Sequence, residues 1–372
     1  MEIIETGQIT HTTANTPQAI YTFPALVQLT DGTLLLTCRS GSNKDSVDET
    51  IELYRSTDDG STWSQPKTPF AEARVNGQKS SFRLCYLTEI NPDHLLAASM
   101  WIDRETHLGK PFFNPKTEGC LPMGIFFADS FDRGETWSEW RTIDLPEELG
   151  PPSLTNPIIN LPDGTLLMNI ETNKHYYDDS KWYQRVVCLH SSDMGQTWGE
   201  PIDAGFDPSG RIFNWDQRVG LAADGTLVTF AWTYDTEAKQ YLNIHRRISN
   251  DNGHTWSEAD DIGITDQAAH PAILPDGQTV LAWVDRYHTQ SIRARLASHP
   301  STEFDPASEV VIYTHQSNDR LQSDDTGALL DEMSIWSFGL PYAEVLANGE
   351  VMVLYYAGNT QTMDIHFARL RI

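Results

Sequence analysis

One eight-residue pattern, Ser-x-Asp-x-Gly-x-Thr-Trp, occurs four times in this chain and restricts its possible folds more than any other feature. The copies lie at residues 56–63, 130–137, 191–198 and 249–256, and each follows a strand-like run of residues. The Asp can accept backbone N–H groups inside a tight turn, the Gly can adopt a positive φ, and the Trp can bury its ring against a sheet. The pattern, here called the Asp box, therefore predicts a hairpin that recurs along the chain.

A second pattern precedes each Asp box and occurs twice more without one. It consists of an apolar strand, a short turn and another apolar strand. The six turns are centred on Asp31-Gly32, Asp93-His94, Asp163-Gly164, Asp224-Gly225, Asp276-Gly277 and Asn348-Gly349. Such turns between apolar runs are strong hairpin signals. Both patterns together define six units with four strand positions each and no helical period between them.

Six such units predict an all-β fold, a six-bladed β-propeller with four-stranded antiparallel blades. We expect residues 1–372 to form this single domain, with residues 1–10 as the outer strand that closes the last blade. The alternatives are a two-sheet sandwich and an open repeat array. The even spacing of the units and the absence of capping repeats favour a closed ring, which also leaves no exposed strand edges.

Composition limits the partners that the chain can have. With 52 Asp and Glu against 26 Lys and Arg, the formal net charge is −26, which argues against nucleic acid and against an anionic membrane surface. Residues 1–6 contain no basic region and no long apolar run, so we expect a cytoplasmic protein, or a secreted one if an export signal has been trimmed. The four Cys are widely spaced without a CxxC pair, and we expect neither a metal nor a cofactor. The oligomeric state stays open.

The functional site is expected on the face opposite the Asp boxes. Residues that enter each first strand, residues that leave each second strand, and the long connections meet there. The predicted substrate-binding residues are Arg39, Arg83, Trp101, Asp103, Arg104, Trp215, Arg218, Arg286 and Trp336. The predicted catalytic residues are Asp45, Glu171, His175, Tyr176, Asp216, His270 and Tyr287. Guanidinium forks, aromatic faces, acids and bases suit an acidic sugar, although ion pairing for the arginines and packing between blades for the tryptophans are alternative roles.

With these repeats the chain resembles the sialidase superfamily, also described as BNR or Asp-box repeat proteins, over nearly its whole length. That family opens its first blade with an Arg-Ile-Pro signature whose Arg joins two others in holding the substrate carboxylate. The matching segment here is residues 21–24, with Thr22 in place of the Arg, and the blade-one acid of the family carries over to Asp45 or Asp48. The family also places a Glu, the partner of its nucleophilic Tyr, ahead of the first strand of a middle blade, and an Arg after the second strand of that blade. At these two positions this chain has Asn156 and Glu171.

The resemblance implies a carbohydrate substrate, and three functions are consistent with the residues. The first is an exo-acting glycoside hydrolase on an acidic or deoxy sugar, with an oligosaccharide or glycoside as substrate. The second is a polysaccharide lyase for rhamnosyl-glucuronate or ulvan-type chains, in which His175 with Tyr176, or His270 with Tyr287 and Arg218, removes the proton α to a uronate carboxylate. The third is a non-catalytic glycan-binding propeller, which the many titratable groups disfavour.

Overall fold

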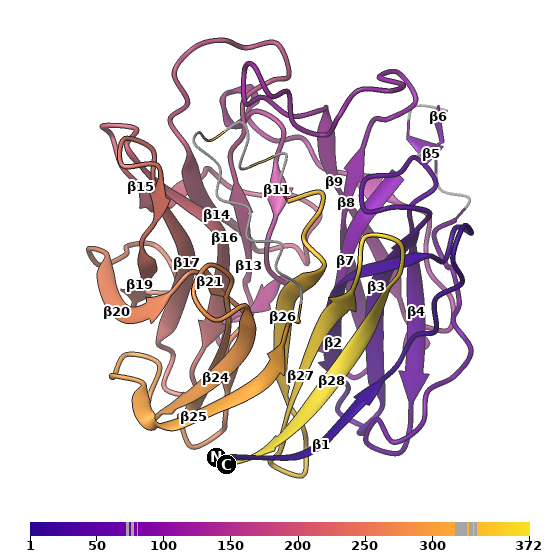
Figure 1. Ribbon diagram of the computed structural model, residues 1–372, viewed down its shortest axis with the longest axis vertical. Helices are drawn as coiled ribbons and strands as arrows, with labels where there is room; N and C mark the ends of the chain where they lie inside the picture. Colours follow the sequence, from indigo (N-terminus) through magenta and orange to yellow (C-terminus); the bar gives the residue numbers. More distant parts are fainter. Residues whose placement is uncertain (72–73, 76–77, 80, 317–325, 327–329, 331–332) are drawn as a thin grey trace.

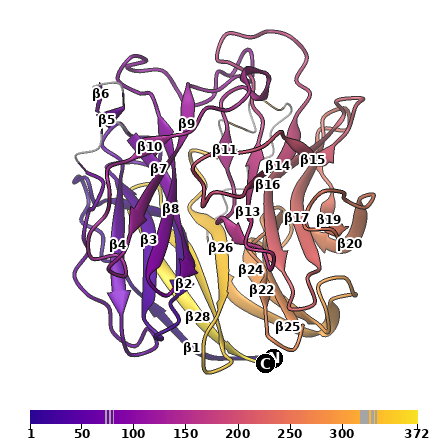
Figure 2. The ribbon, with the colours of Figure 1, turned by 180° about the vertical axis from the view of Figure 1, so that it is seen from behind.

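The computed structural model describes residues 1–71, 74–75, 78–79, 81–316, 326, 330 and 333–372, which fold as an all-β propeller. Twisted sheets stand side by side around a central axis, the long connections gather at one end, and both termini lie at the other end (Figures 1 and 2). A 3₁₀ turn, η1 (Glu147–Leu149), lies in one of the connections. Within the described residues, no helix has the length and apolar character needed to cross a membrane.

The largest sheet joins the two ends of the chain. Its seven strands are β1 (Glu2–Gln8), β2 (Ile20–Gln28), β3 (Leu34–Gly41), β4 (Thr50–Ser56), β26 (Phe338–Val345), β27 (Val351–Gly358) and β28 (Met363–Arg371). The sequence predicted two separate blades here, but β2 and β28 are connected by one parallel bridge between Ile20 and Met363. Closing the ring places the first and last units side by side, which accounts for this bridge. β1 pairs with β28 along its length.

Four further sheets continue around the axis. One contains β7 (Ser81–Asn91), β8 (His94–Ile102), β9 (Met123–Ser130) and β10 (Arg141–Thr142). The next contains β11 (Ser153–Leu154), β12 (Ile159–Asn160), β13 (Leu166–Glu171), β14 (Arg185–Ser191) and β15 (Ile202–Phe206). The third contains β16 (Ile212–Leu221), β17 (Leu227–Asp235), β18 (Gln240–Tyr241), β19 (Asn243–Ser249) and β20 (Asp260–Thr265). The fourth contains β21 (Gln267–Ala268), β22 (Ala272–Ile273), β23 (Thr279–Asp285), β24 (Ser291–Ala297) and β25 (Asp305–Thr314), and β5 (Arg74–Val75) and β6 (Gln78–Lys79) form a separate small hairpin.

Some sheets depart from the predicted four strands because a strand is split. β11 and β12 both pair with β13, and β21 and β22 both pair with β23. Pro157 and Pro271 lie in the two gaps. Proline has no N–H to donate to the neighbouring strand, so the ladder is interrupted at these positions.

The Asp boxes form the tight turns that the sequence predicts. In the first box, Asp58 accepts the backbone N–H of Thr62 at 2.9 Å and the Thr62 hydroxyl at 2.6 Å, while Gly60 N donates to Ser56 Oγ at 2.9 Å. The other three boxes repeat these bonds. Gly60 has φ +80° and lies against Leu34 at the start of β3, so the boxes adjoin the hairpin-turn end of the strands. This end is away from the long connections.

Candidate functional site

A cavity opens at the end of the propeller opposite the Asp boxes. It encloses about 930 Å³, solvent at its mouth included. Its charged lining residues are Lys44, Arg83, Glu171, Asp216 and Arg286, and its aromatic ones are Phe23, Phe112, Phe113, Trp182, Trp215, Trp232, Trp336 and Tyr356. These side chains come from the starts of first strands, the ends of second strands, and the connections. In antiparallel hairpins those positions share one end of the sheet, so residues distant in sequence meet there.

Breaks in the register of the inner strands direct side chains into this cavity. The pairing of β2, β7, β16 and β26 shifts near the start of each strand. The residues at these irregularities include Phe23, Arg83, Asp216 and Leu340, all of which line the cavity. Phe23, Asp216 and Leu340 have positive φ angles of 53°, 43° and 45°. A β-bulge bends its strand and changes the direction of a side chain, and such strained positions are found at functional sites.

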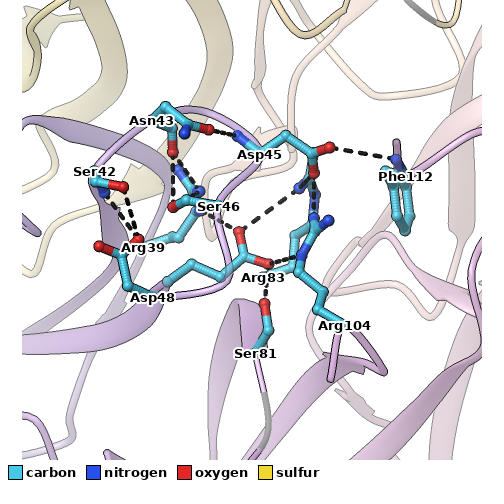
Figure 3. Close-up of polar contacts among 11 residues, drawn as sticks. Arg39, Ser42, Asn43, Asp45, Ser46, Asp48, Ser81, Arg83, Arg104 and Phe112 are labelled. Carbon is cyan, nitrogen blue, oxygen red and sulfur yellow. Dashed lines mark hydrogen bonds and ion pairs between the residues drawn. The ribbon is translucent and has the colours of Figure 1, made fainter. Parts of the chain in front are cut away.

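Three arginines on one side of the cavity are compensated by two carboxylates (Figure 3). Arg39 Nε donates to Glu49 at 2.6 Å, and Arg83 Nη1 donates to Asp45 at 3.1 Å. Arg104 contacts both carboxylates and lies 3.3 Å from Glu49. Burial alone would raise the pKa of Glu49, but the three guanidinium groups hold it below its usual value. Of these three arginines only Arg83 lines the cavity, so the charges of this cluster mainly compensate one another.

Two carboxyl groups on another part of the wall have raised pKa values. Glu171, at the end of β13, is buried, and its Oε1 has no hydrogen-bond partner among the described residues. Burial, and next the charge of Asp216, raise the pKa of Glu171 to about 8. Burial also raises the pKa of Asp216, although Arg218 Nη2 donates to it at 2.7 Å. Arg218 Nη1 donates to the Tyr86 hydroxyl at 2.9 Å. The raised pKa favours the protonated form of Glu171 at neutral pH, and the residue lines the cavity.

A third group consists of Lys44, Arg286 and Tyr356. Lys44 Nζ donates to the carbonyl oxygens of Met333 and Trp336 at 2.8 and 2.7 Å, and to the Tyr356 hydroxyl at 2.9 Å. Burial, followed by nearby arginines, lowers the pKa of Lys44 well below its usual value. The Arg286 guanidinium lies 3.9 Å from the centroid of the Trp336 ring, a cation–π contact.

The structure brings together a part of the predicted site. The predicted residues that line the cavity are Arg83, Glu171, Trp215, Asp216, Arg286 and Trp336. Four further predicted residues are linked to this lining by ion pairs. Asp45 pairs with Arg83 and Arg218 with Asp216, whereas Arg39 and Arg104 are linked indirectly, through Glu49 and Asp45.

The remaining predicted residues lie outside the cavity lining. His175 is exposed, Tyr176 packs against Tyr177, and Asp103 accepts the N–H of Thr106. Trp101 packs edge-on against Phe126, and Tyr287 stacks on Tyr241.

His270 is half-buried outside the cavity lining, against the ring of Tyr342, and its Nδ1 is 3.0 Å from Asn156. Burial, and then the charge of Arg218, lower the pKa of His270 to about 3. The two histidine sets predicted for proton abstraction are therefore not placed around this cavity.

Sequence reasoning did not single out Lys44, Glu49 or Tyr86. Lys44 follows Asn43 in a polar connection, where a lysine side chain is ordinarily exposed. Tyr86 lies in an apolar strand, and its sequence position resembles that of a core tyrosine. Partners from distant sheets give these residues their roles, and no local pattern marks such partners.

One group of possible metal ligands occurs among the described residues, namely Asp266, Asp285 and His288, whose ligand atoms lie within 4.8 Å of one another. Asp266 Oδ2 accepts the N–H groups of Arg286 and Tyr287 at 2.8 and 3.3 Å. Asp285 Oδ1 accepts the N–H of His288 at 3.1 Å. These bonds form the turn that positions Arg286.

Comparison with known proteins supports the fold and the family. A family model described as a BNR repeat-like domain matches residues 111–329. A protein of unknown function from Dyadobacter fermentans superposes with a TM-score of 0.75 and 20% identity, covering 100% of this chain and 99% of the other. The intramolecular trans-sialidase from Ruminococcus gnavus, in complex with oseltamivir carboxylate, has a TM-score of 0.68 and 13% identity, covering 98% and 97%. The K499G mutant of the NanB sialidase from Streptococcus pneumoniae has a TM-score of 0.67 and 14% identity, covering 98% of this chain and 70% of the other. No curated protein matches the sequence.

Proposed function

The chain belongs to the family of BNR repeat-like domains, and on this premise we propose that it is a carbohydrate-active enzyme, an exo-acting glycoside hydrolase on an acidic sugar. The observation that carries the proposal is the buried carboxyl of Glu171 on the wall of an aromatic cavity, where its Oε1 has no hydrogen-bond partner among the described residues and burial raises its pKa to about 8. A glycosidase needs a general acid to protonate the leaving-group oxygen, and a carboxyl with a raised pKa can do so at neutral pH.

We also propose that the ring has six blades, with the seven-stranded sheet taken as two. Its halves, β26-β27-β28-β1 and β2-β3-β4, are joined by a single parallel bridge, whereas β27 and β28 pair through eight residues each. A one-residue connection is a contact between neighbouring blades rather than a ladder within one blade. In a six-membered ring, first strands of five units contribute to the cavity, through Phe23, Arg83, Leu154, Asp216 and Leu340.

The cavity supplies the other groups that hydrolysis needs. Asp216, whose charge Arg218 compensates, provides a second carboxylate beside Glu171. Tryptophan rings such as Trp215 and Trp232 provide flat apolar faces for a sugar ring. Arg83, Lys44 and Arg286 give the lining a cationic part, which favours a substrate with negative charge.

The first prediction concerns the substitution Glu171→Gln. The amide keeps the shape of the side chain but cannot transfer the proton, so we expect kcat to fall by about 10²–10⁴-fold, the typical contribution of a general acid. Activity is measured by release of the reducing sugar from a panel of alkyl glycosides that includes a glucuronide, a sialoside and a rhamnoside, because their alkoxide leaving groups require a proton. Thermal unfolding should show that the variant is folded.

The matched control is Glu344→Gln, because burial raises the pKa of Glu344 to about 8 and this residue is outside the cavity lining. It should retain the kcat of the parent. Equal activity of the parent and Glu171→Gln would contradict the assignment of the acid. Rhamnosyl-glucuronate and ulvan-type oligosaccharides complete the panel. An unsaturated uronate as product, detected by its ultraviolet absorbance, would indicate a lyase, and binding without any product would indicate a glycan-binding module.

A further inference from the structure

The wall of the cavity is mainly apolar, and its neutral polar groups are engaged within the protein. The lining residues with an amide or an aliphatic hydroxyl are Ser153, Thr155 and Asn173. Thr155 Oγ1 donates to the carbonyl of Gln217 at 2.9 Å and accepts Nδ2 of Asn169 at 2.9 Å. Asn173 Nδ2 donates to Ser153 Oγ at 3.0 Å. These hydrogen bonds leave few neutral groups of the wall for the hydroxyls of a ligand.

This scarcity bears on the group that leaves when the glycosidic bond breaks. The charged residues of the lining serve the acidic sugar itself. A second sugar as leaving group would bring several hydroxyls, and a buried hydroxyl without a partner costs free energy. An aliphatic leaving group has no such requirement, and each methylene that it buries against the wall favours binding. The wall therefore favours an apolar leaving group over another sugar.

Four tryptophans make up a continuous part of this apolar wall. The ring centroids of Trp182 and Trp215 lie 6.4 Å apart, and those of Trp232 and Trp336 also lie 6.4 Å apart. Trp215 and Trp232 are cross-strand partners in β16 and β17, so their side chains lie on the same face of the sheet. Asp216 directly follows Trp215 and also lines the cavity. The tryptophan wall therefore adjoins the carboxyl groups that are proposed for catalysis.

The connection that carries Trp182 is fixed to β16. Gln184 Nε2 donates to the carbonyl of Asn214 at 2.9 Å, and Gln184 Oε1 accepts the Asn214 N–H at 2.8 Å. The Trp182 ring packs on Phe213 with 4.9 Å between the ring centroids. The wall is thus formed before a ligand binds, which reduces the entropy lost on binding.

Exposed apolar side chains continue this surface outside the cavity. Among the described residues, eight large apolar side chains are exposed, and five of them belong to the long connections at the cavity end (Figure 1). These five, here called the rim, are Val47, Leu108, Tyr177, Tyr183 and Ile335, with exposed fractions of 45–72%. Apolar side chains that gather at one part of a protein surface mark a place of interaction.

The rim and the cavity wall belong to the same connections. Trp182 lines the cavity, and the next residue, Tyr183, is exposed. Trp336 lines the cavity, and the residue before it, Ile335, is exposed. A chain that extends out of the cavity can therefore stay in contact with apolar side chains.

We propose that the tryptophan wall and the rim bind an aliphatic aglycone, so that the substrates are amphiphilic glycosides in which an acidic sugar is linked to a long aliphatic chain. This inference rests on the proposed function and specifies its substrate class. The sugar occupies the charged part of the cavity near Glu171, and the chain runs along the tryptophan wall to the rim.

The test varies the aglycone while the sugar stays the same. The substrates are the methyl, butyl and octyl glycosides of the sugar that the panel shows to be cleaved fastest, or of D-glucuronate if none is cleaved, all below the concentration at which they form micelles. Each buried methylene contributes about threefold to fourfold, so kcat/KM of the butyl glycoside should exceed that of the methyl glycoside by about 10–60-fold. The affinity of the Glu171→Gln variant, measured without turnover by isothermal titration calorimetry, should rise in the same order.

The double variant Tyr177→Ser/Tyr183→Ser tests the rim. Loss of the two exposed rings should lower the ratio of kcat/KM for the octyl and butyl glycosides by about threefold or more. Phe131→Ser is the matched control, because Phe131 is an exposed aromatic residue of an Asp box, at the other end of the propeller. It should keep the ratio of the parent.

Equal kcat/KM for the methyl and octyl glycosides, or equal ratios in the double variant and in Phe131→Ser, would overturn the inference and leave the hydrolase proposal intact. Dimers in sedimentation that the double variant abolishes, with an unchanged ratio, would assign the rim to a second copy of the chain and overturn it as well. If chain length strengthens binding to Glu171→Gln but no glycoside is hydrolysed by the parent, the apolar subsite stands and the hydrolase proposal fails. Neither hydrolysis nor an effect of chain length on binding would contradict both.

Discussion

The role of a charged residue in this cavity depends on whether another residue of the protein compensates its charge. Arg39 and Arg286 are both buried arginines at the ends of second strands, yet Arg39 is neutralised by Glu49 and Arg286 has no such partner among the described residues. Glu49 and Glu171 are both buried glutamates, yet surrounding arginines lower the pKa of one, while burial raises the pKa of the other. Residue type alone therefore does not distinguish a structural charge from a functional one.

The raised pKa of Glu171 has a direct consequence for the pH dependence of activity. The acid form of Glu171 is the active one, so kcat should fall as pH rises through its pKa of about 8, and protonation of the Asp216 carboxylate should lower kcat on the acidic side. Asp216→Asn removes the second cause of the upward shift and should move this basic limb to lower pH. Kinetics from pH 5 to 10 on the best glycoside of the panel provide the measurement. A limb near the usual glutamate value of about 4.3 would mean that Glu171 is ionised and is not the acid.

At the scale of single elements, the Asp box is readable from sequence because its hydrogen bonds are local. Asp251 accepts the Thr255 N–H at 2.9 Å, the Thr255 hydroxyl at 2.7 Å and the Ser249 hydroxyl at 2.7 Å. All partners lie within four residues, so spacing and residue type determine the turn. The bulges at Phe23 and Asp216 and the buried Lys44 are different, since they depend on neighbouring sheets. The repeat pattern thus identifies the fold and the face of the site, whereas pairing within the site requires the tertiary structure.

We expect Asp251→Ala to destabilise the fold without changing catalysis. The substitution removes the acceptor of three hydrogen bonds in a turn, and each is worth about 1 kcal/mol in typical cases, so the free energy of unfolding should fall by about 1–3 kcal/mol. The box lies at the end away from the cavity, so kcat and KM should match those of the parent. Denaturant titration together with glycoside kinetics tests both parts. A large loss of kcat in a folded variant would contradict the separation of turn and site.

At the scale of the whole molecule, the contact between the chain ends closes the ring. β1 pairs with β28, and Asp364 accepts the hydroxyl of Thr10 and the N–H of Thr12, both at 2.9 Å. Arg371 donates to Glu2 at 2.7 Å. These contacts join residues more than 350 positions apart, and they cover the edge of β28 that would otherwise be exposed. The stability of the ring should therefore be sensitive to the packing of this one strand pair.

Gly7 provides a sharp test of that closure. It lies directly opposite Phe367, and a Cβ at this position would be 2.5 Å from Phe367 Cε1. Gly→Ala in a strand ordinarily stabilises, since glycine costs about 0.5–1 kcal/mol there. Here we expect Gly7→Ala to destabilise by about 1–3 kcal/mol, because the buried ring must move. The exposed neighbour Thr6, changed to Val, should have little effect.

A double-mutant cycle with Phe367→Leu isolates the cause of the Gly7 effect. The smaller side chain leaves room for the Ala methyl group, so the two substitutions together should cost less than the sum of their separate effects in denaturant unfolding. The expected coupling free energy is about 0.5–3 kcal/mol. Additive effects would mean that the Ala side chain does not meet Phe367. A Gly7→Ala variant as stable as the parent would show that β1 does not pack against β28 in the register described.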